Sequence, residues 1–250
     1  MCCFSGVVKE VSATRIFARM VSPGRQVLAY QMQLATDAEV AMILPIPVPP
    51  NSADDAVRFI SLERYPTMFD ALYKAFAPVP ALGPGRAQAN SYAPPLEVHT
   101  VGAFIASFVP RLADFTRLDA RFRVPPGTLD RIPEYADWGF AVFQLGATRG
   151  TAQVHPMAFE FPTRERTRLF FPTVHVHDGA VHPEAEFAHR LYAQGIAGVR
   201  PFVTNRSNAS TFVDAERTEG IIDPDQPVSV RELVGMHPNR DQWTALPDAV

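Results

Sequence analysis

The stretch TRIFARMVSPGRQVLAYQMQLA, residues 14–35, carries the clearest structural signal in the chain. In its second half, every second residue from Leu28 to Leu34 is apolar, and a period of two is typical of a β-strand. The Pro23-Gly24 pair between the two halves is a turn signal. The pattern therefore predicts two strands joined as an antiparallel hairpin.

Proline usage extends this β-rich interpretation to the rest of the chain. The 250 residues include 24 prolines against 14 glycines, and proline is excluded from helix interiors and central strands. Helical spacing of apolar residues marks residues 51–77 and 112–122, and residues 186–195 are ambiguous between strand and helix. We therefore expect an α+β fold of mostly antiparallel β-sheet with a few helices, built as two lobes or one pseudo-duplicated domain.

Composition divides the chain into four expected segments. Residues 1–80 hold the N-terminal β-hairpin and helices, and residues 81–95 form a loop rich in proline, glycine and small side chains. A second β-rich lobe covers residues 96–195. The polar residues 196–250 are expected to be irregular.

Charge and hydropathy exclude several classes of partner. The 23 basic and 26 acidic residues give a net charge of -3, which provides no electrostatic attraction for nucleic acid or an anionic membrane. No apolar run approaches the ~20 residues that span a bilayer, and no export leader is recognisable. We expect a cytoplasmic protein that binds a metal ion or small molecule, with its oligomeric state left open.

Four apolar segments follow one another in a recognisable order: MILPIPVPP at 42–50, WGFAVFQL at 138–145, HPMAFEFP at 155–162 and FFPTVHVHDG at 170–179. Together with the hairpin, this order resembles the uncharacterised bacterial family called domain of unknown function 2330, over roughly residues 1–195. The resemblance concerns the fold. Because the family has no established activity, it assigns no role to any residue.

Three of the seven histidines lie within eight residues, in the stretch FFPTVHVHDGAVHPE at 170–184. Its central Asp-Gly pair favours a type I′ turn between two short strands. Counting outward from that turn places His175 opposite His182, with His177 on the same face of the hairpin. Three imidazoles on one face can converge on a single ion, because opposed and alternate side chains are close neighbours.

Imidazole nitrogen is a good ligand for zinc and copper, so the sequence predicts a copper or zinc site formed by this histidine cluster. His155 and His99, each in an apolar context, are candidates for a fourth ligand. The alternative is a solvated hairpin face that binds nothing. Whether such a metal-binding protein is also an enzyme stays open at this point.

Both cysteines directly follow the initiator methionine, in the stretch MCCFSG. Cys2 and Cys3 are candidate thiolate ligands that would complete the histidine site. Alternatively, Cys2 is the catalytic nucleophile of an N-terminal-nucleophile amide hydrolase, with its own α-amino group, of pKa about 7.7–8.0, as the base. A third possibility is that both are small buried side chains of a metal-free binding or scaffolding module.

Overall fold

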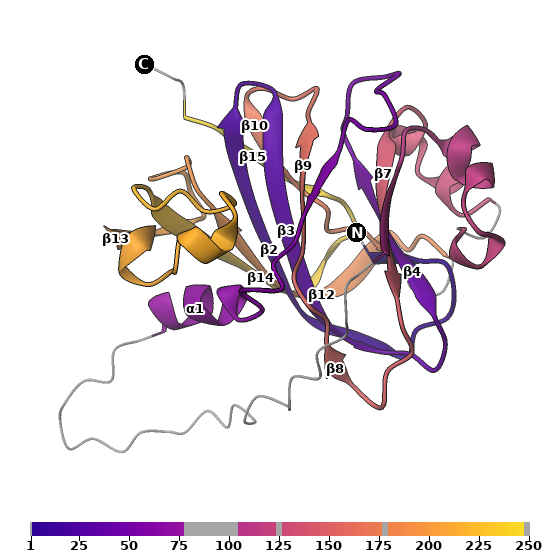
Figure 1. Cartoon of the computed structure of the whole chain (residues 1–250), viewed down its shortest axis with the longest axis horizontal. Helices are drawn as coiled ribbons and strands as arrows, with labels where there is room; N and C mark the ends of the chain where they lie inside the picture. The colour runs from indigo at the N-terminus through magenta and orange to yellow at the C-terminus, as the bar shows by residue number, and fades with distance from the viewer. Residues whose placement is uncertain (1, 78–104, 124–126, 177–179, 248–250) are drawn as a thin grey trace.

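Strands dominate the computed structural model, which describes residues 2–77, 105–123, 127–176 and 180–247 (Figure 1). The largest sheet has eight strands and is mostly antiparallel. Seven of them lie in one row, and the eighth, β8, pairs with β3. In spatial order they are β13 (Val203–Asn208), β14 (Pro227–Pro238), β12 (Glu184–Ala193), β2 (Glu10–Ser22), β3 (Arg25–Ala35), β9 (Met157–Pro162) and β5 (Arg58–Ile60), with β8 (Ala152–Gln153).

Two smaller sheets and a few helical turns complete the described chain. The five-stranded sheet runs β11 (His175–Val176), β1 (Cys2–Phe4), β4 (Val40–Ile46), β7 (Gly139–Leu145) and β6 (Ile105–Val109), and β10 (Arg168–Phe171) pairs with β15 (Gln242–Ala245). The α-helix α1 spans Met68–Ala75. Short 3-10 turns occupy Leu112–Arg117, Ala120–Phe122, Leu129–Arg131, Pro133–Tyr135, Ala209–Thr211 and Glu216–Thr218.

The expected α+β class is wrong, because within the described ranges β-strands far outweigh helix and α1 is the one α-helix. The helix expected over 112–122 is instead two 3-10 turns. Leu118 between them has an extended backbone, with ψ of 157°, which interrupts any continuous helix. Likewise, part of the helical region expected at 51–77 is strand β5, whose residues pair with β9.

The predicted hairpin at 14–35 is confirmed by strands β2 and β3, which pair antiparallel down to Ser22 opposite Arg25. Gly24 supplies the positive φ of 79° that the turn requires. Both faces of β3 are buried, because the alternating residues that begin at Leu28 face one core and those that begin at Val27 face another. The hairpin is therefore the middle layer of the molecule.

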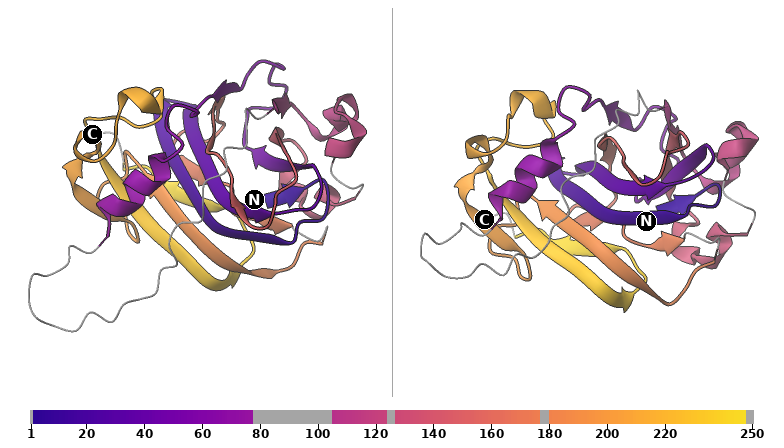
Figure 2. Two further views of the ribbon diagram at one scale, coloured as in Figure 1. Left: turned by 60° about the horizontal axis from the view of Figure 1, so that its bottom comes forward. Right: turned by 90° about the horizontal axis from the view of Figure 1, so that it is seen from below.

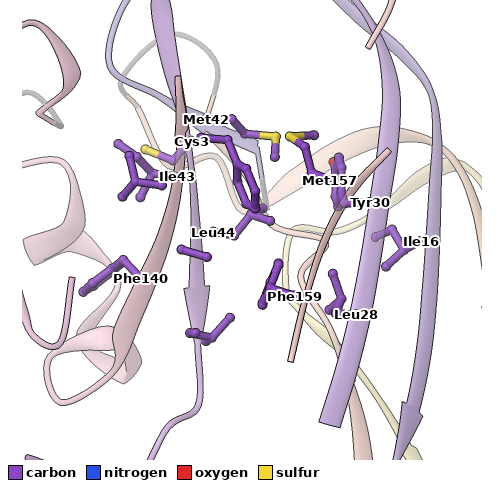
Figure 3. Close-up of a cluster of buried hydrophobic side chains, with 14 of the residues drawn as sticks. Cys3, Ile16, Leu28, Tyr30, Met42, Ile43, Leu44, Phe140, Met157 and Phe159 are labelled. Carbon is purple, nitrogen blue, oxygen red and sulfur yellow. The ribbon is translucent and has the colours of Figure 1, made fainter. Parts of the chain in front are cut away.

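The main hydrophobic core lies between the eight-stranded and five-stranded sheets (Figure 3). Leu28 and Phe159 reach into it from the large sheet, and Met42 and Phe140 reach into it from the small one. Its residues run in sequence from Cys3 to Phe202, so segments from both halves of the chain share one core. Burial of this apolar surface is the main force that holds the two sheets together.

A second core forms between the other face of the large sheet and α1. Met68, Phe69 and Leu72 of the helix pack there with Tyr192 from β12. The segment expected to be irregular, residues 196–250, contributes strands β13, β14 and β15. No helix among the described residues combines the length and the apolar composition that crossing a bilayer requires.

Candidate functional site

The N-terminal strand β1 is inserted between two other strands of the small sheet. It runs parallel to β11, with Cys2 as the ladder partner of His175, and antiparallel to β4, with Cys3 opposite Ile43. Cys3 and Phe4 are almost completely buried, and this burial accounts for the position of the strand. The fold therefore brings the N-terminus and the first histidine of the cluster into adjacent positions.

A pair of histidines from two sheets lies beside this strand. His175 belongs to β11 and His189 to β12, and their Nε2 atoms are 3.3 Å apart. The ring of Phe187 stacks on that of His175 with centroids 4.5 Å apart, and His189 is only 3% exposed. At this separation one Nε2 can donate a hydrogen bond to the other, and the tautomers of the two rings decide which one is the donor.

The turn between β14 and β15 holds β11 in place through the side chain of Asn239. Its Oδ1 accepts the backbone N–H of His175 at 2.7 Å, and its Nδ2 donates to the carbonyl of His175 at 2.9 Å. Nδ2 also donates to the carbonyl of His182 at 3.0 Å. One amide side chain thus fixes the backbone on both sides of the histidine-rich segment.

Asp241 anchors the approach to β11 from the same turn. Its Oδ1 accepts the backbone N–H groups of Thr173 and Val174 at 2.8 and 3.1 Å, and its Oδ2 accepts the Tyr135 hydroxyl at 2.5 Å. Burial raises the pKa of Asp241 above its ordinary value, although these hydrogen bonds act in the opposite direction. Burial and the carboxylate likewise raise the pKa of Tyr135.

The structure corrects the predicted histidine hairpin. His175 pairs with Cys2 rather than with His182, which is exposed and lies in no strand, and β12 begins only at Glu184. The physical reason is that β11 gains a buried position beside β1, while Asn239 binds the His182 carbonyl. His177 falls outside the described residues, so its predicted place beside His175 stays a prediction.

The other candidate ligands have different surroundings. Cys3 is buried at the start of the main core, and Nδ1 of His155 lies 3.0 Å from the Pro156 carbonyl. The side chain of Cys2 and the whole of His99 lie outside the described parts of the chain. Across those parts, no three His, Cys, Asp or Glu residues are grouped closely enough to hold one metal ion.

Three residues of this region are absent from the sequence-based expectations: His189, Asn239 and Asp241. His189 does have a signal in the sequence, because it is the polar member of an alternating apolar face that includes Phe187 and Leu191. Asn239 and Asp241 lie in a polar turn whose sequence looks like ordinary surface. Their partners are distant in the sequence, so no local pattern identifies them.

Comparison with known proteins places the chain in a structural class. No protein-family model matches it, and no curated protein matches it. A solved structure, however, has the same overall fold over nearly its whole length, so the chain is a β-sheet protein of that architecture.

That structure is baculovirus P35, with a TM-score of 0.52 at 12% sequence identity, covering 96% of this chain and 99% of P35. A mutated P35 after caspase cleavage gives a TM-score of 0.47 at 14% identity, covering 97% and 100% of the two chains. P35 in its complex with caspase-8 gives 0.42 at 12% identity, covering 94% and 96%. At such identities, the likeness to P35 establishes the fold alone.

Proposed function

We propose that this chain is a protein-binding module whose partner is a protease. The observation that supports the proposal is the match to baculovirus P35, which extends over 96% of this chain and 99% of P35. P35 itself has been seen in complex with caspase-8 and after caspase cleavage. The proposal assigns a class of partner by analogy with the fold of P35, so a binding measurement is needed to test it.

The composition of the chain is compatible with this class of function. The net charge of -3 is small, and a fold with two hydrophobic cores can present a preformed surface to a partner. This agrees with the metal-free binding module, one of the three alternatives that the sequence leaves open. Rigid presentation favours binding because little conformational entropy is lost on association.

The test is to mix the purified chain with caspase-8 and follow complex formation by size-exclusion chromatography and residual peptidase activity. We expect a stable complex with a Kd of about 1 μM or tighter and loss of peptidase activity as the chain is added. Baculovirus P35 is the positive control. An irreversibly heat-denatured sample of the chain is the negative control. Full caspase activity and separate elution at 10-fold excess of the chain, with P35 active in parallel, would refute the proposal for this protease.

A second candidate function, copper or zinc binding, is favoured by the geometry of the histidine pair. Two nitrogens bound to tetrahedral zinc at about 2.0–2.1 Å lie about 3.3–3.4 Å apart. The Nε2 atoms of His175 and His189 are 3.3 Å apart, the ring of Phe187 stacks on that of His175, and Asn239 binds the His175 backbone. We propose Cys2, the ladder partner of His175, as the thiolate that would complete this site.

Metal titration of the reduced protein distinguishes this candidate from the others. We expect one equivalent of zinc in the native chain and at least a tenfold weaker affinity in His175→Ala, His189→Ala and Cys2→Ser, because each variant removes one ligand. His155→Ala is the matched control and should bind normally. Unchanged affinity in His189→Ala would eliminate this site, whereas loss of amide hydrolysis in Cys2→Ser without any bound metal would instead support the N-terminal-nucleophile alternative.

A further inference from the structure

Strand β14 leaves part of its outer side without a neighbouring strand. On its inner side, β14 pairs with β12 from Ser229 to Pro238. On its outer side, β13 pairs with β14 no further than Val230. Figure 2 shows β14, coloured yellow, at the margin of the large sheet. In the described ranges, no strand pairs with the outer side of residues 231–238, which we call the free edge.

The hydrogen-bond pattern identifies which backbone groups point out of the sheet. The N–H of Asn239 donates to the Pro183 carbonyl at 2.9 Å, and this bond continues the β12–β14 register by one residue. Odd-numbered residues of β14 therefore exchange their bonds with β12, and even-numbered residues point outward, because the two kinds alternate in an antiparallel ladder. The outward groups of the free edge belong to Glu232, Val234 and Met236, with the carbonyl of Pro238 at its end.

One further contact agrees with this assignment. The carbonyl of Val234 accepts from Nε2 of His237 at 2.9 Å, so that carbonyl is directed away from β12. The carbonyl oxygen keeps a second lone pair for another donor. The Val234 carbonyl is thus directed toward the position of an added strand, with His237 already bound to it.

The side chains of the free edge are unusually apolar for an exposed edge. Val234 is 65% exposed and Met236 is 63% exposed, and both project from the same face of the sheet. Proteins generally protect such edges with lysine, proline or a short strand. The free edge has Arg231 and Glu232 at one end and Pro238 at the other, and its centre, from Leu233 to Met236, has no charged residue and no proline.

We propose that the free edge pairs with the free edge of a second copy of this chain, in antiparallel orientation about a two-fold axis at Gly235. In this register Val234 faces Met236 of the second copy, twice by symmetry, and Glu232 faces Pro238. The pairing extends over the whole free edge. It ends before Val230, which already pairs with Val203 of β13. A two-fold axis one residue earlier would place Pro238 against Val230, which β13 already occupies.

The proposed register satisfies the physical requirements of a sheet junction. Each Val234–Met236 pair exchanges two backbone hydrogen bonds, and each Glu232–Pro238 pair makes a single one because proline has no N–H. The exposed apolar side chains become cross-strand neighbours and bury each other. Gly235 faces Gly235 in a pair without hydrogen bonds, where Cα atoms come within about 4.5 Å, and no like charges are directly opposed.

Analytical ultracentrifugation of the chain alone tests the proposal. We expect a species of twice the 27.6 kDa mass of one chain. Met236→Lys should weaken dimerisation on the order of a hundredfold, because it places charge at the centre of the junction in both copies. Val234→Pro should do the same by removing an outward N–H that β12 does not use, so the fold itself is retained.

Val7→Lys is the matched control, since Val7 is also exposed but lies outside the free edge, and it should leave the dimer intact. Amide hydrogen exchange gives a second readout: Glu232, Val234 and Met236 should be protected in the native chain and exchange rapidly in Met236→Lys. The amides of Leu233 and Gly235, which face β12, should be protected in both. A single-chain mass at about 100 μM, or protection that appears only when another protein is added, would overturn the second copy as the occupant.

Discussion

Phe159→Ala is expected to lower the free energy of unfolding by about 3–5 kcal/mol, the range for removing a fully buried phenylalanine ring. Phe159 lies in β9 of the large sheet and has no exposed surface. Its ring centroid is 5.9 Å from that of Phe143, which belongs to the small sheet, and 6.2 Å from that of Phe59. The substitution therefore leaves a cavity between the two sheets.

Urea unfolding followed by far-ultraviolet circular dichroism measures this effect. The transition should stay single and move as a whole to lower urea, because the two sheets share one core. Phe159→Leu keeps most of the apolar volume and should cost less than half as much. Two separate transitions, of which one keeps the native midpoint, would show that the sheets unfold independently and would contradict a shared core.

Asp241→Ala is expected to lower the free energy of unfolding by about 2–4 kcal/mol, because buried hydrogen-bond donors lose their acceptor. Those donors are the N–H groups of Thr173 and Val174 and the hydroxyl of Tyr135, and all three residues are almost fully buried. The loss should also release β11 from its place beside β1. Amide exchange at Val176 should therefore accelerate more than exchange in the β2–β3 hairpin.

Asp241→Asn is the matched control, since its side-chain oxygen can still accept from both backbone N–H groups. We expect it to cost less than about 1 kcal/mol at neutral pH, because only the bond with Tyr135 is altered. Equal losses in the alanine and asparagine variants would show that charge, and not hydrogen bonding, is what Asp241 contributes.

Comparison of the native chain with Asp241→Asn gives a prediction about the pH dependence of stability. Burial raises the pKa of Asp241 above its ordinary value of 3.8, so the folded state favours the protonated carboxyl. The resulting stabilisation is complete below that ordinary pKa and is lost as the pH rises through the raised pKa of the folded state. The stability of the native chain relative to Asp241→Asn should therefore fall as the pH rises above about 4 through the raised pKa of the folded state, and then level off.

Local patterns in the sequence determine the elements whose signals are close together along the chain. The β2–β3 hairpin is predicted correctly because the alternation of apolar residues and the Pro23-Gly24 turn both act within one short segment. Helices are harder to predict, because the apolar spacing at 112–122 suits a helix while the extended backbone at Leu118 divides it into 3-10 turns. The α+β expectation is wrong for this reason.

The neighbours of the histidines illustrate what the sequence could not show. An Asp-Gly pair between two valine-rich segments predicts a hairpin with His182, yet β11 pairs with the N-terminal strand β1, which is far away in the sequence. Periodicity shows which side of a strand is apolar, but it does not identify the strand that lies beside it. That choice depends on the total surface buried in the core and on distant polar side chains such as Asn239.

The sequence by itself thus determined that the protein is rich in β-strands and that residues 14–35 form a hairpin, and it singled out Cys2 and the 175–182 segment as candidate site residues. Only the tertiary structure decided that Cys2 lies beside His175, that His189 is the second histidine of the pair and that β14 ends in a free edge. The physical reason is that these features depend on which distant segments become neighbours, and burial of the shared core decides that. Local propensity acts over a few residues, whereas burial acts on the whole chain at once.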